Sequence, residues 1–238
     1  MQFADMHNHI LFGVDDGARS EAEMYRMLDA SYADGVRHLC FTPHYHPSYF
    51  GEHQEQISAA FGLAEAYAAQ NCPDLKLYLG NEIRYERSCI EWLEQARCRS
   101  LNDTAYLLVG FLYPEPAENI LEAMLRVLNA GYTPVLAHVE RYETFHRDLR
   151  EIDCLKSRGV KLQVDAQSPL GGLGHGAKVR ARRLLDTGAV DLIASDAHDL
   201  ARRPPQLSVC FEFVSRKYGA GYAQHLFWEE PLRIVNAK

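Results

Sequence analysis

The sequence predicts an α/β protein whose parallel strands close into a barrel with helices on the outside. Short apolar, β-branched segments alternate with segments of helical periodicity about seven times along the chain. Such alternation is typical of a parallel sheet covered by helices. The chain lacks a dinucleotide-type glycine fingerprint, and its 238 residues suit one barrel. We therefore expect a barrel rather than an open sheet, built as a single domain over residues 1–238.

The strands are expected where short apolar runs are rich in β-branched residues. A short strand opens the chain and ends at the first histidines. The spacing of the later runs leaves room for a helix after each of them, as parallel strands require. These later strands are predicted at Val36–Thr42, Leu75–Leu79, Ala105–Leu112, Thr133–His138, Val160–Asp165 and Val190–Ser195.

The first helix is the most clearly marked. Ser20-Glu21-Ala22-Glu23 has the spacing of a capping box, and Met24, Met27 and Leu28 follow at helical spacing. Glycines fall where helices should end before the next strand, at Gly35, Gly131, Gly159 and Gly188. Further helices are predicted at Glu52–Ala69, Ser88–Arg97, Glu118–Asn129, Arg147–Lys156, Lys178–Asp186 and Gln206–Lys217.

Composition excludes several classes of protein. Hydrophobic residues make up 47% of the chain, which is enough for a substantial core. The net charge is -7, with 32 acidic and 25 basic side chains, and this argues against binding to nucleic acid or to an anionic membrane. We see no signal peptide and no apolar run near the ~20 residues that a membrane span needs, so we expect a cytoplasmic protein. The six cysteines are scattered and read as reduced thiols.

Metal-binding side chains recur at the predicted carboxyl ends of the strands. His7 and His9 are two residues apart, so on a strand both imidazoles point to the same face. In parallel barrels, functional side chains project from the carboxyl ends of the strands. Five predicted strand ends carry a histidine or a carboxylate, which is more than chance placement would give. The residues at the later strand ends are His44, Glu82, His138, Asp196 and His198.

The residue types indicate which ions such a site would hold. Histidine and carboxylate without thiolate suit Zn, Mn or Fe. These ligands are too many for one ion, so we expect two or three divalent ions, with Glu82 able to bridge two of them. Two close ions can hold both the attacking and the leaving oxygen of a phosphoryl displacement. Hydrolysis of a phosphate ester is the chemistry that this pattern favours.

Five short motifs, in this order, resemble those of the polymerase and histidinol phosphatase (PHP) superfamily. The Val14-Asp15-Asp16-Gly17 segment, His138-x-x-Arg141-Tyr142 and Arg203-Pro204-Pro205 resemble one branch in particular. That branch contains the bacterial tyrosine-protein phosphatases of capsular and exopolysaccharide loci, the CpsB/YwqE type. The five motifs are Asp5-Met6-His7-Asn8-His9, Thr42-Pro43-His44, Gly80-Asn81-Glu82, Ala137-His138-Val139-Glu140-Arg141-Tyr142 and Ala194-Ser195-Asp196-Ala197-His198.

The resemblance implies a distorted (β/α)7 barrel, the PHP fold, with a trinuclear site that manganese usually activates. It also implies that Arg141 and Arg203 grip the phosphate, and a guanidinium fork does fit phosphate oxygens. The implied ligand sets are His7, His9, Glu82 and Asp196 for the first ion, Glu82 and His138 for the second, and Asp16, His44 and His198 for the third.

One position departs from the family pattern. Between Glu82 and His138 the family places another carboxylate ligand of the second ion, late in the fourth strand. Here Gly110 occupies that place, so no side chain is available. We expect the second ion to recruit water or a nearby acid such as Glu115, or to bind weakly.

The predicted activity is hydrolysis of phosphotyrosine on a protein, by in-line attack of a metal-bridging hydroxide. The resemblance implies that the substrate is the tail of a bacterial tyrosine autokinase of polysaccharide assembly. Arg141 and the ions would neutralise the developing charge, and Asp196, Asp16 or His44 would assist proton transfer. An aromatic wall of Tyr45, Tyr49 and Phe50 for the phenyl ring, and a rim position for His46, are further possibilities beside ordinary packing. The oligomeric state stays open.

Three alternatives remain open at this point. Cys210 and Arg216 fit the Cys-x5-Arg spacing of cysteine phosphatases, although the intervening residues are bulky and read as helix interior. A small-molecule phosphatase, acting for example on histidinol phosphate, would use the same metal chemistry. A non-catalytic PHP regulator is the third alternative, because Gly110 replaces an expected ligand.

Overall fold

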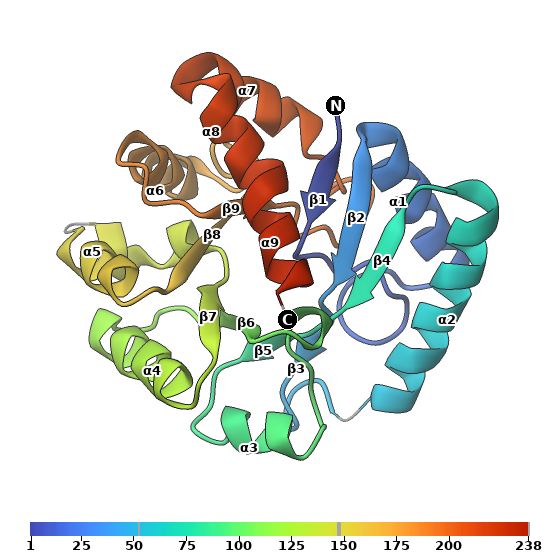
Figure 1. Cartoon of the computed structure of the whole chain (residues 1–238), viewed down its shortest axis with the longest axis horizontal. Coiled ribbons are helices and arrows are strands. Elements are labelled where there is room, and N and C mark those ends of the chain that lie inside the picture. The colour runs from blue at the N-terminus through green and yellow to red at the C-terminus, as the bar shows by residue number, and fades with distance from the viewer. Residues whose placement is uncertain (52, 147–148, 238) are drawn as a thin grey trace.

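Parallel strands occupy the centre of the molecule and helices surround them (Figure 1). The structure is a computed structural model that describes residues 1–51, 53–146 and 149–237. Every pairing between named strands is parallel. The strands in these residues are β1 (Phe3–Asp5), β2 (Val36–Phe41), β3 (His44–Tyr45), β4 (Lys76–Leu79), β5 (Glu82–Arg84), β6 (Tyr106–Gly110), β7 (Thr133–Leu136), β8 (Lys161–Asp165) and β9 (Leu192–Ala194).

The strands curl into a distorted barrel, as the sequence predicts. Their order is β1-β2-β4 in one sheet and β3-β5-β6-β7-β8-β9 in the other. Two barrel strands are interrupted, because β2 resumes as β3 beyond Thr42-Pro43 and β4 resumes as β5 beyond Gly80-Asn81. The ends meet just after β1 and β9, where Asn8 bridges Ala197 and the His9 N–H donates to the Ala197 carbonyl at 2.8 Å.

The predicted helices are all present, with shifted ends. Ser20 caps the first helix by accepting from the Glu23 N–H at 3.2 Å, but the Glu23 carboxylate accepts from the Arg19 N–H rather than completing a capping box. The predicted starts at Glu52 and Arg147 lie outside the described residues. The helices are α1 (Glu21–Asp34), α2 (Gln54–Asn71), α3 (Cys89–Glu94), α4 (Ala117–Asn129), α5 (Arg150–Ser157), α6 (His175–Asp186) and α7 (Ser208–Tyr218).

Four glycines end helices as predicted. Gly35, Gly131, Gly159 and Gly188 all have positive φ, between 69° and 107°. Gly35 is the plainest case, because its N–H caps α1 by donating to the carbonyls of Ser31 and Tyr32. Only glycine adopts this left-handed backbone without strain, which explains its place at these turns.

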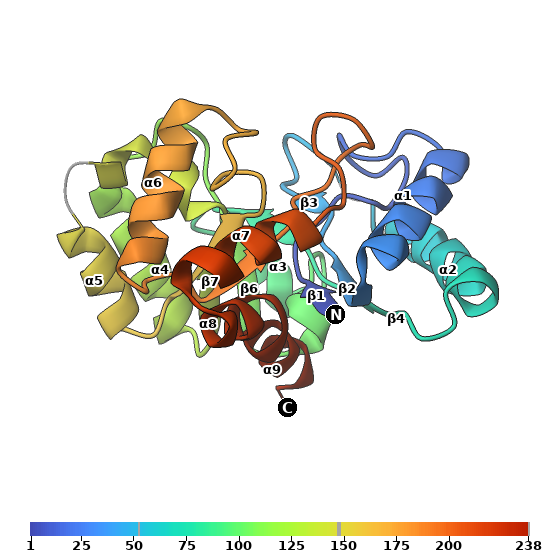
Figure 2. The ribbon, with the colours of Figure 1, turned by 90° about the horizontal axis from the view of Figure 1, so that it is seen from above.

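The helices at the end of the chain were not predicted. After α7 the backbone continues as α8 (Ala220–Gln224), a π-helical turn (His225–Glu229) and α9 (Glu230–Asn236). Figure 1 shows α9 across the centre of the strands, and Figure 2 places α9 and both termini on one side, with the loops that follow several strands on the other. Ile234 and Val235 of α9 pack against side chains in the barrel interior. These are Ala4, Met6, Cys40, Leu101, Leu108, Val135, Ala137 and Leu192.

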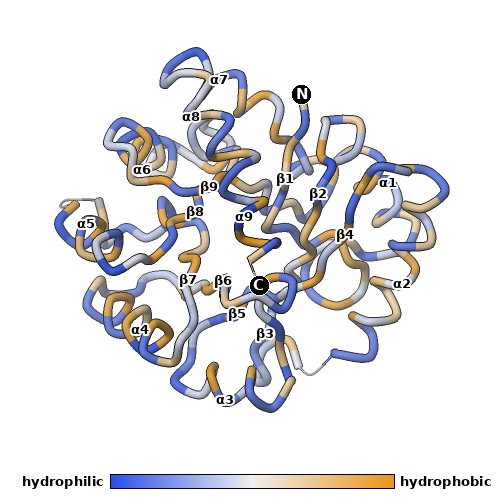
Figure 3. The backbone as a smooth tube through the Cα atoms, in the orientation of Figure 1, coloured by the Kyte–Doolittle hydropathy of each residue, from blue (hydrophilic) through white to orange (hydrophobic). Residues whose placement is uncertain are grey.

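The barrel interior is therefore a packed core closed by α9 at the amino ends of the strands, which leaves the carboxyl ends for a site. Figure 3 shows apolar stretches along β6 and β7 near the centre and hydrophilic stretches in the outer turns. Among the described residues, none of the helices combines the length and apolarity that a bilayer crossing requires.

Candidate metal centre

Four side chains converge on one point at the carboxyl end of the barrel. The Nε2 atoms of His7 and His9 lie 3.3 Å apart. Glu82 Oε2 lies 3.3 Å from His7 Nε2 and 3.4 Å from His9 Nε2. Asp196 Oδ1 lies 3.4 Å from both of these nitrogens. All four side chains are buried, so the structure brings together the residues that the sequence predicts for a first ion.

The donor chemistry of this group fits a divalent cation. Burial lowers the pKa of His7, but the carboxylates of Glu82 and Asp196 outweigh it and raise that pKa to about 9. Burial likewise raises the pKa of Glu82, yet His44 and His7 hold it well below the ordinary value. Without a cation, His7 and His9 stay protonated because the neighbouring carboxylates favour their charged form. A divalent ion would replace those protons and bind the same nitrogen and oxygen atoms.

A second group of ligand atoms lies next to the first. Side-chain donors of His9, Asp16, His44 and His198 all lie within 4.8 Å of one another. Asp16 Oδ1 is 3.4 Å from His44 Nε2 and 3.5 Å from His198 Nε2. His44 also links the two groups, because its Nδ1 lies 2.8 Å from Glu82 Oε2. Asp16, His44 and His198 thus share one place, as the family resemblance implies.

The surroundings of Gly110 explain why no side chain stands there. A Cβ at Gly110 would lie 2.4 Å from Glu82 Oε1, which is closer than real Cβ contacts come. The same Glu82 oxygen is 2.9 Å from His138 Nε2. The side chain of Glu82 therefore occupies the space next to Gly110. Glu115, one of the expected substitutes, accepts from Asn119 and does not line the cavity around these side chains, so the structure does not bring it to the site.

Three polar residues whose role was not predicted orient the histidines. Asp15 Oδ2 lies 2.6 Å from His9 Nδ1, Gln163 Oε1 lies 3.0 Å from His7 Nδ1, and the Tyr113 hydroxyl lies 2.8 Å from His138 Nδ1. In each case the Nε2 atom is left to face the site. Such partners fix the ring orientation and tautomer of ligating histidines.

Backbone geometry also serves the site. His138 and Asp196 follow β7 and β9 with φ of 36° and 49°, a left-handed conformation that costs free energy in residues other than glycine. Gly17 is required for a steric reason, because a Cβ there would lie 1.9 Å from the His9 carbonyl oxygen. The glycine of Asp15-Asp16-Gly17 allows the loop to lie against His9. Asp15 and Asp16 then both reach the histidines.

Two arginines border these groups of side chains and share one carboxylate, that of Asp196. Arg141 Nη2 lies 2.6 Å from Asp196 Oδ2 and 2.7 Å from Asp165 Oδ2. Arg203 Nη1 lies 3.2 Å from the same Asp196 oxygen. Arg141 therefore pairs with two buried carboxylates at the site.

A cavity of about 240 Å³ is lined by members of both groups, among them Glu82, Asp196 and His198. Of the predicted aromatic wall, Phe50 lines the cavity and stacks on His44, with ring centroids 4.6 Å apart. Tyr45 is buried against Trp92, and Tyr49 lies under the Arg84 guanidinium, so neither contributes to the wall. His46 pairs with Glu86 at 3.0 Å and does not line the cavity.

The cysteine alternative is wrong. Cys210 is 1% exposed within α7, and burial raises the pKa of its thiol far above the ordinary value. Arg216 points away and pairs with Glu212 at 3.1 Å. A buried, protonated thiol without a phosphate cradle cannot act as a nucleophile.

These features match one family along nearly the whole chain. The capsular polysaccharide synthesis family CpsB/CapC matches residues 3–236. The chain belongs to the CpsB/CapC family. It is 33% identical to the tyrosine-protein phosphatase CpsB of Streptococcus pneumoniae over 236 residues, which cover 97% of each chain. It is 27% identical to the tyrosine-protein phosphatase YwqE of Bacillus subtilis (strain 168), over 91% of this chain and 85% of YwqE.

Solved structures agree with this membership. A crystal structure from the work on YwqE of Bacillus subtilis and CpsB of Streptococcus pneumoniae, described as unique metal-dependent tyrosine phosphatases, superposes with a TM-score of 0.89. Its sequence identity is 26%, and the match covers 99% of this chain and 95% of that one. Histidinol phosphate phosphatase of Lactococcus lactis shares the fold, with a TM-score of 0.56 and 16% identity over 83% of this chain and 86% of that one. The CpsB/CapC chain thus has the PHP-type fold that its motifs imply.

Proposed function

We propose that this CpsB/CapC chain is a metal-dependent tyrosine-protein phosphatase, a phosphoric monoester hydrolase like the relatives so named. The observation that carries the proposal is the position of Asp196. One of its oxygens faces His7 and His9, and the other faces Arg141 and Arg203. A phosphate near this carboxylate would lie between the metal ligands and two guanidinium groups. Bound divalent ions would supply Lewis acidity and an activated water at neutral pH.

The ligand groups support two or three ions. We assign His7, His9, Glu82 and Asp196 to the first, and Asp16, His44 and His198 to another. Glu82 and His138 together would hold a further ion. Manganese is our choice, with iron or zinc as alternatives, because histidine and carboxylate donors suit all three.

The arginines and the cavity wall would bind the two parts of a phosphotyrosine, its phosphate and its phenyl ring. Arg141 and Arg203 would hold the phosphate oxygens and stabilise negative charge as the ester bond breaks. Phe50 and Leu112 line the same cavity and offer apolar surface to a phenyl ring. Asp196 would hold both arginines in position. We propose a phosphotyrosine protein as the partner, specifically the tail of a tyrosine kinase of polysaccharide assembly, in keeping with the CpsB/CapC family and with the expected cytoplasmic location.

The test is turnover of a phosphotyrosine peptide by protein stripped of metal and then supplied with Mn²⁺. We expect activity to vanish with EDTA and to return with Mn²⁺. Arg141→Gln should lower kcat by about 100-fold, the typical loss when one preorganised donor to a developing charge is removed. Cys210→Ser serves as the control and should retain activity. Turnover that survives EDTA would contradict the proposal.

Two further measurements on the same purified protein test the two alternative functions. Comparing histidinol phosphate with the phosphotyrosine peptide at equal concentration tests the small-molecule phosphatase, for which the shared fold is the only support. An elemental count of metals per chain tests the non-catalytic regulator. Little bound metal together with no turnover on added Mn²⁺ would favour the regulator.

A further inference from the structure

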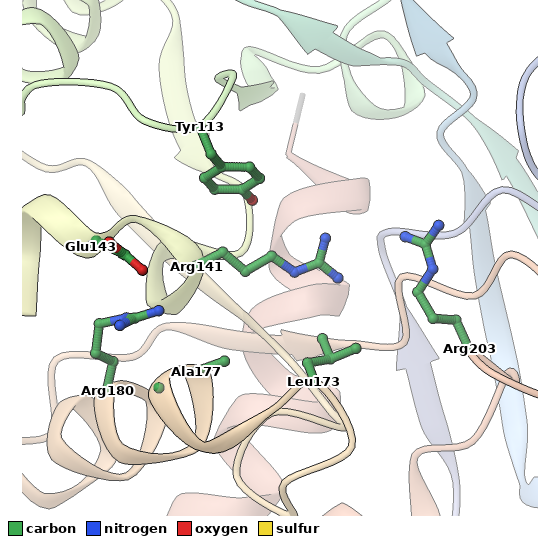
Figure 4. A pocket seen from close by; sticks show the side chains of 8 residues that line it. Tyr113, Arg141, Glu143, Leu173, Ala177, Arg180 and Arg203 are labelled. Carbon is green, nitrogen blue, oxygen red and sulfur yellow. The ribbon is translucent and has the colours of Figure 1, made fainter.

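A second hollow opens beside the metal cavity. It measures about 490 Å³ and lies between the loop around Tyr113 and the start of α6. The two hollows meet, because both are lined by Tyr113, Arg141 and Arg203. In Figure 4, Arg180 lies at one end of this groove, Arg203 at the other and Arg141 between them. The remaining lining residues are Glu143, Leu173, Gly176 and Ala177.

The charge of this groove is positive. Three arginines line it against one carboxylate, that of Glu143. Arg141 and Arg203 are already partly neutralised, since both pair with Asp196. Arg180 differs, because no carboxylate of the described residues lies within ion-pair distance of it. Its charge is therefore available to a ligand.

The orientation of Arg180 is fixed. Its Nε donates to the backbone carbonyl of Glu140, immediately before Arg141. This bond uses one of the five N–H donors of the guanidinium, and none of the described residues accepts from Nη1 or Nη2. A purely structural role would explain the bond from Nε to Glu140, but it would give no function to the donors on Nη1 and Nη2. A held guanidinium with free outer donors is suited to a carboxylate.

We propose that this groove binds the polypeptide on one side of the phosphotyrosine, and that Arg180 selects an acidic side chain there. The inference rests on the proposed function, since it requires a peptide whose phosphotyrosine enters the metal cavity. A flanking residue would reach the groove because successive Cα atoms of an extended chain advance about 3.3–3.6 Å. Arg180 is thus a specificity-determining residue for protein substrates.

The experiment compares phosphotyrosine peptides that differ in their neighbours. One series carries Glu at a single position up to three residues before or after the phosphotyrosine, and matched series carry Gln or Lys. The wild-type protein with Mn²⁺ should favour the best Glu peptide over its Gln match by about fivefold in kcat/KM, through KM, as fits a half-exposed ion pair. Arg180→Gln should bring this ratio near one, and Arg180→Glu should make the Lys peptide the better substrate.

The controls separate this inference from the proposed function. Arg216→Gln removes an equal charge at an exposed position of α7 that does not line the groove, and it should leave the Glu/Gln ratio unchanged. A wild-type ratio near one, or a ratio that survives Arg180→Gln, would overturn the role of Arg180 while phosphotyrosine turnover stands. Were no peptide hydrolysed, the proposed function would fail instead. The same ratios of Kd from fluorescence anisotropy would then still decide whether Arg180 selects acidic peptides.

Discussion

Several residues in this site have more than one partner, and Glu82 is the clearest example. Its Oε2 faces His7, His9 and His44, and its Oε1 faces His138. No other ligand reaches all of these histidines. The side chain can do so because Gly110 leaves room for it. The glycine that looks like a missing ligand in the sequence is, in the structure, the neighbour that this position of Glu82 requires.

Gly110→Ala therefore tests the packing around Glu82. The added Cβ would lie 2.4 Å from Glu82 Oε1, so the carboxylate must move away from His138. We expect metal affinity to fall by about tenfold or more, as it does when groups that position metal ligands are lost. Competition with a metal-sensitive dye measures this. Gly62→Ala, in an open place on α2, is the matched control and should bind metal normally. Unchanged affinity in Gly110→Ala would show that the site relaxes freely.

Asp5 gives a prediction for the pH dependence of stability. Its carboxylate accepts from the N–H and the hydroxyl of Ser195, but burial raises its pKa from 3.8 to about 6. The unfolded chain loses this proton first, so the contribution of Asp5 to stability is fully present below about pH 4 and is lost as the pH rises to about 6. With about 1.4 kcal/mol for each pKa unit, the loss amounts to about 3 kcal/mol.

Urea unfolding of metal-free protein at several pH values measures this term. Other carboxylates titrate in the same range, so the quantity to follow is the difference between the wild type and Asp5→Asn. That difference should shift in favour of the variant as the pH rises. Asp103→Asn, an exposed change, is the control. A difference that stays constant with pH would mean that folding does not raise the pKa of Asp5.

At the scale of elements, periodic segments were predictable and irregular ones were not. Apolar patterning, capping and terminal glycines predict the strands β1, β2, β4 and β6 to β9 and the helices α1 to α7, but not the short strands β3 and β5. The break between β2 and β3 at Thr42-Pro43 was not expected, because each half pairs with a different strand. The end of the chain was also missed, since Gly219, Gly221 and Pro231 interrupt the helical pattern. Those helices are held by packing on the barrel, which a single sequence does not display.

Some residues of the site could likewise be predicted from the sequence, and others could not. Residues at strand ends could be predicted because parallel strands bring their carboxyl ends together. Asp15, Gln163 and Tyr113 could not, because their role depends on distances to histidines that lie up to 156 positions away in the chain. Arg180 was missed for a similar reason, as its helix meets the 3-10 turn after β7 only in the fold.

Helix α9 is expected to stabilise the barrel without affecting the site. Ile234 is fully buried against the barrel interior at the end opposite the metal ligands. Ile234→Ala should lower the free energy of unfolding by about 2–5 kcal/mol, because it leaves a cavity. Val209→Ala, at a 46% exposed position on α7, should change it little. Denaturant unfolding measures both, and metal affinity should be equal in the two variants. A loss of metal affinity in Ile234→Ala alone would show that the two ends of the barrel are coupled.

At the scale of the whole molecule, the proposed metal ligands come from around the barrel. They follow β1, β7 and β9 and lie on β3 and β5. The closure between the first and last strands lies directly beneath them, at Asn8 and Ala197. Ions bound to these side chains would link segments that the barrel otherwise joins through a few backbone bonds. Any ligand that binds only the folded state also stabilises it by mass action.

Metal should therefore raise the melting temperature, and its effect should depend on pH. At metal concentrations 100 times Kd the gain is about 2.7 kcal/mol, or roughly 5–10 °C for a chain of this size. His7, with a pKa of about 9 in the metal-free site, and His9, whose pKa also lies well above the ordinary value, hold protons near neutral pH that a cation must displace. Binding thus releases protons, and affinity weakens as the pH falls.

Scanning calorimetry with and without Mn²⁺ at about pH 8 and pH 6 tests both statements. The shift in melting temperature should be larger at the higher pH, and His7→Ala should reduce it at both. His225→Ala, on the helical surface far from the ligands, should behave as the wild type does. Titration calorimetry in buffers of different ionisation enthalpy gives the protons released directly, and a value near zero would show that the histidines are already neutral before metal binds. Because these readouts do not involve a substrate, they test the ligand set independently of turnover.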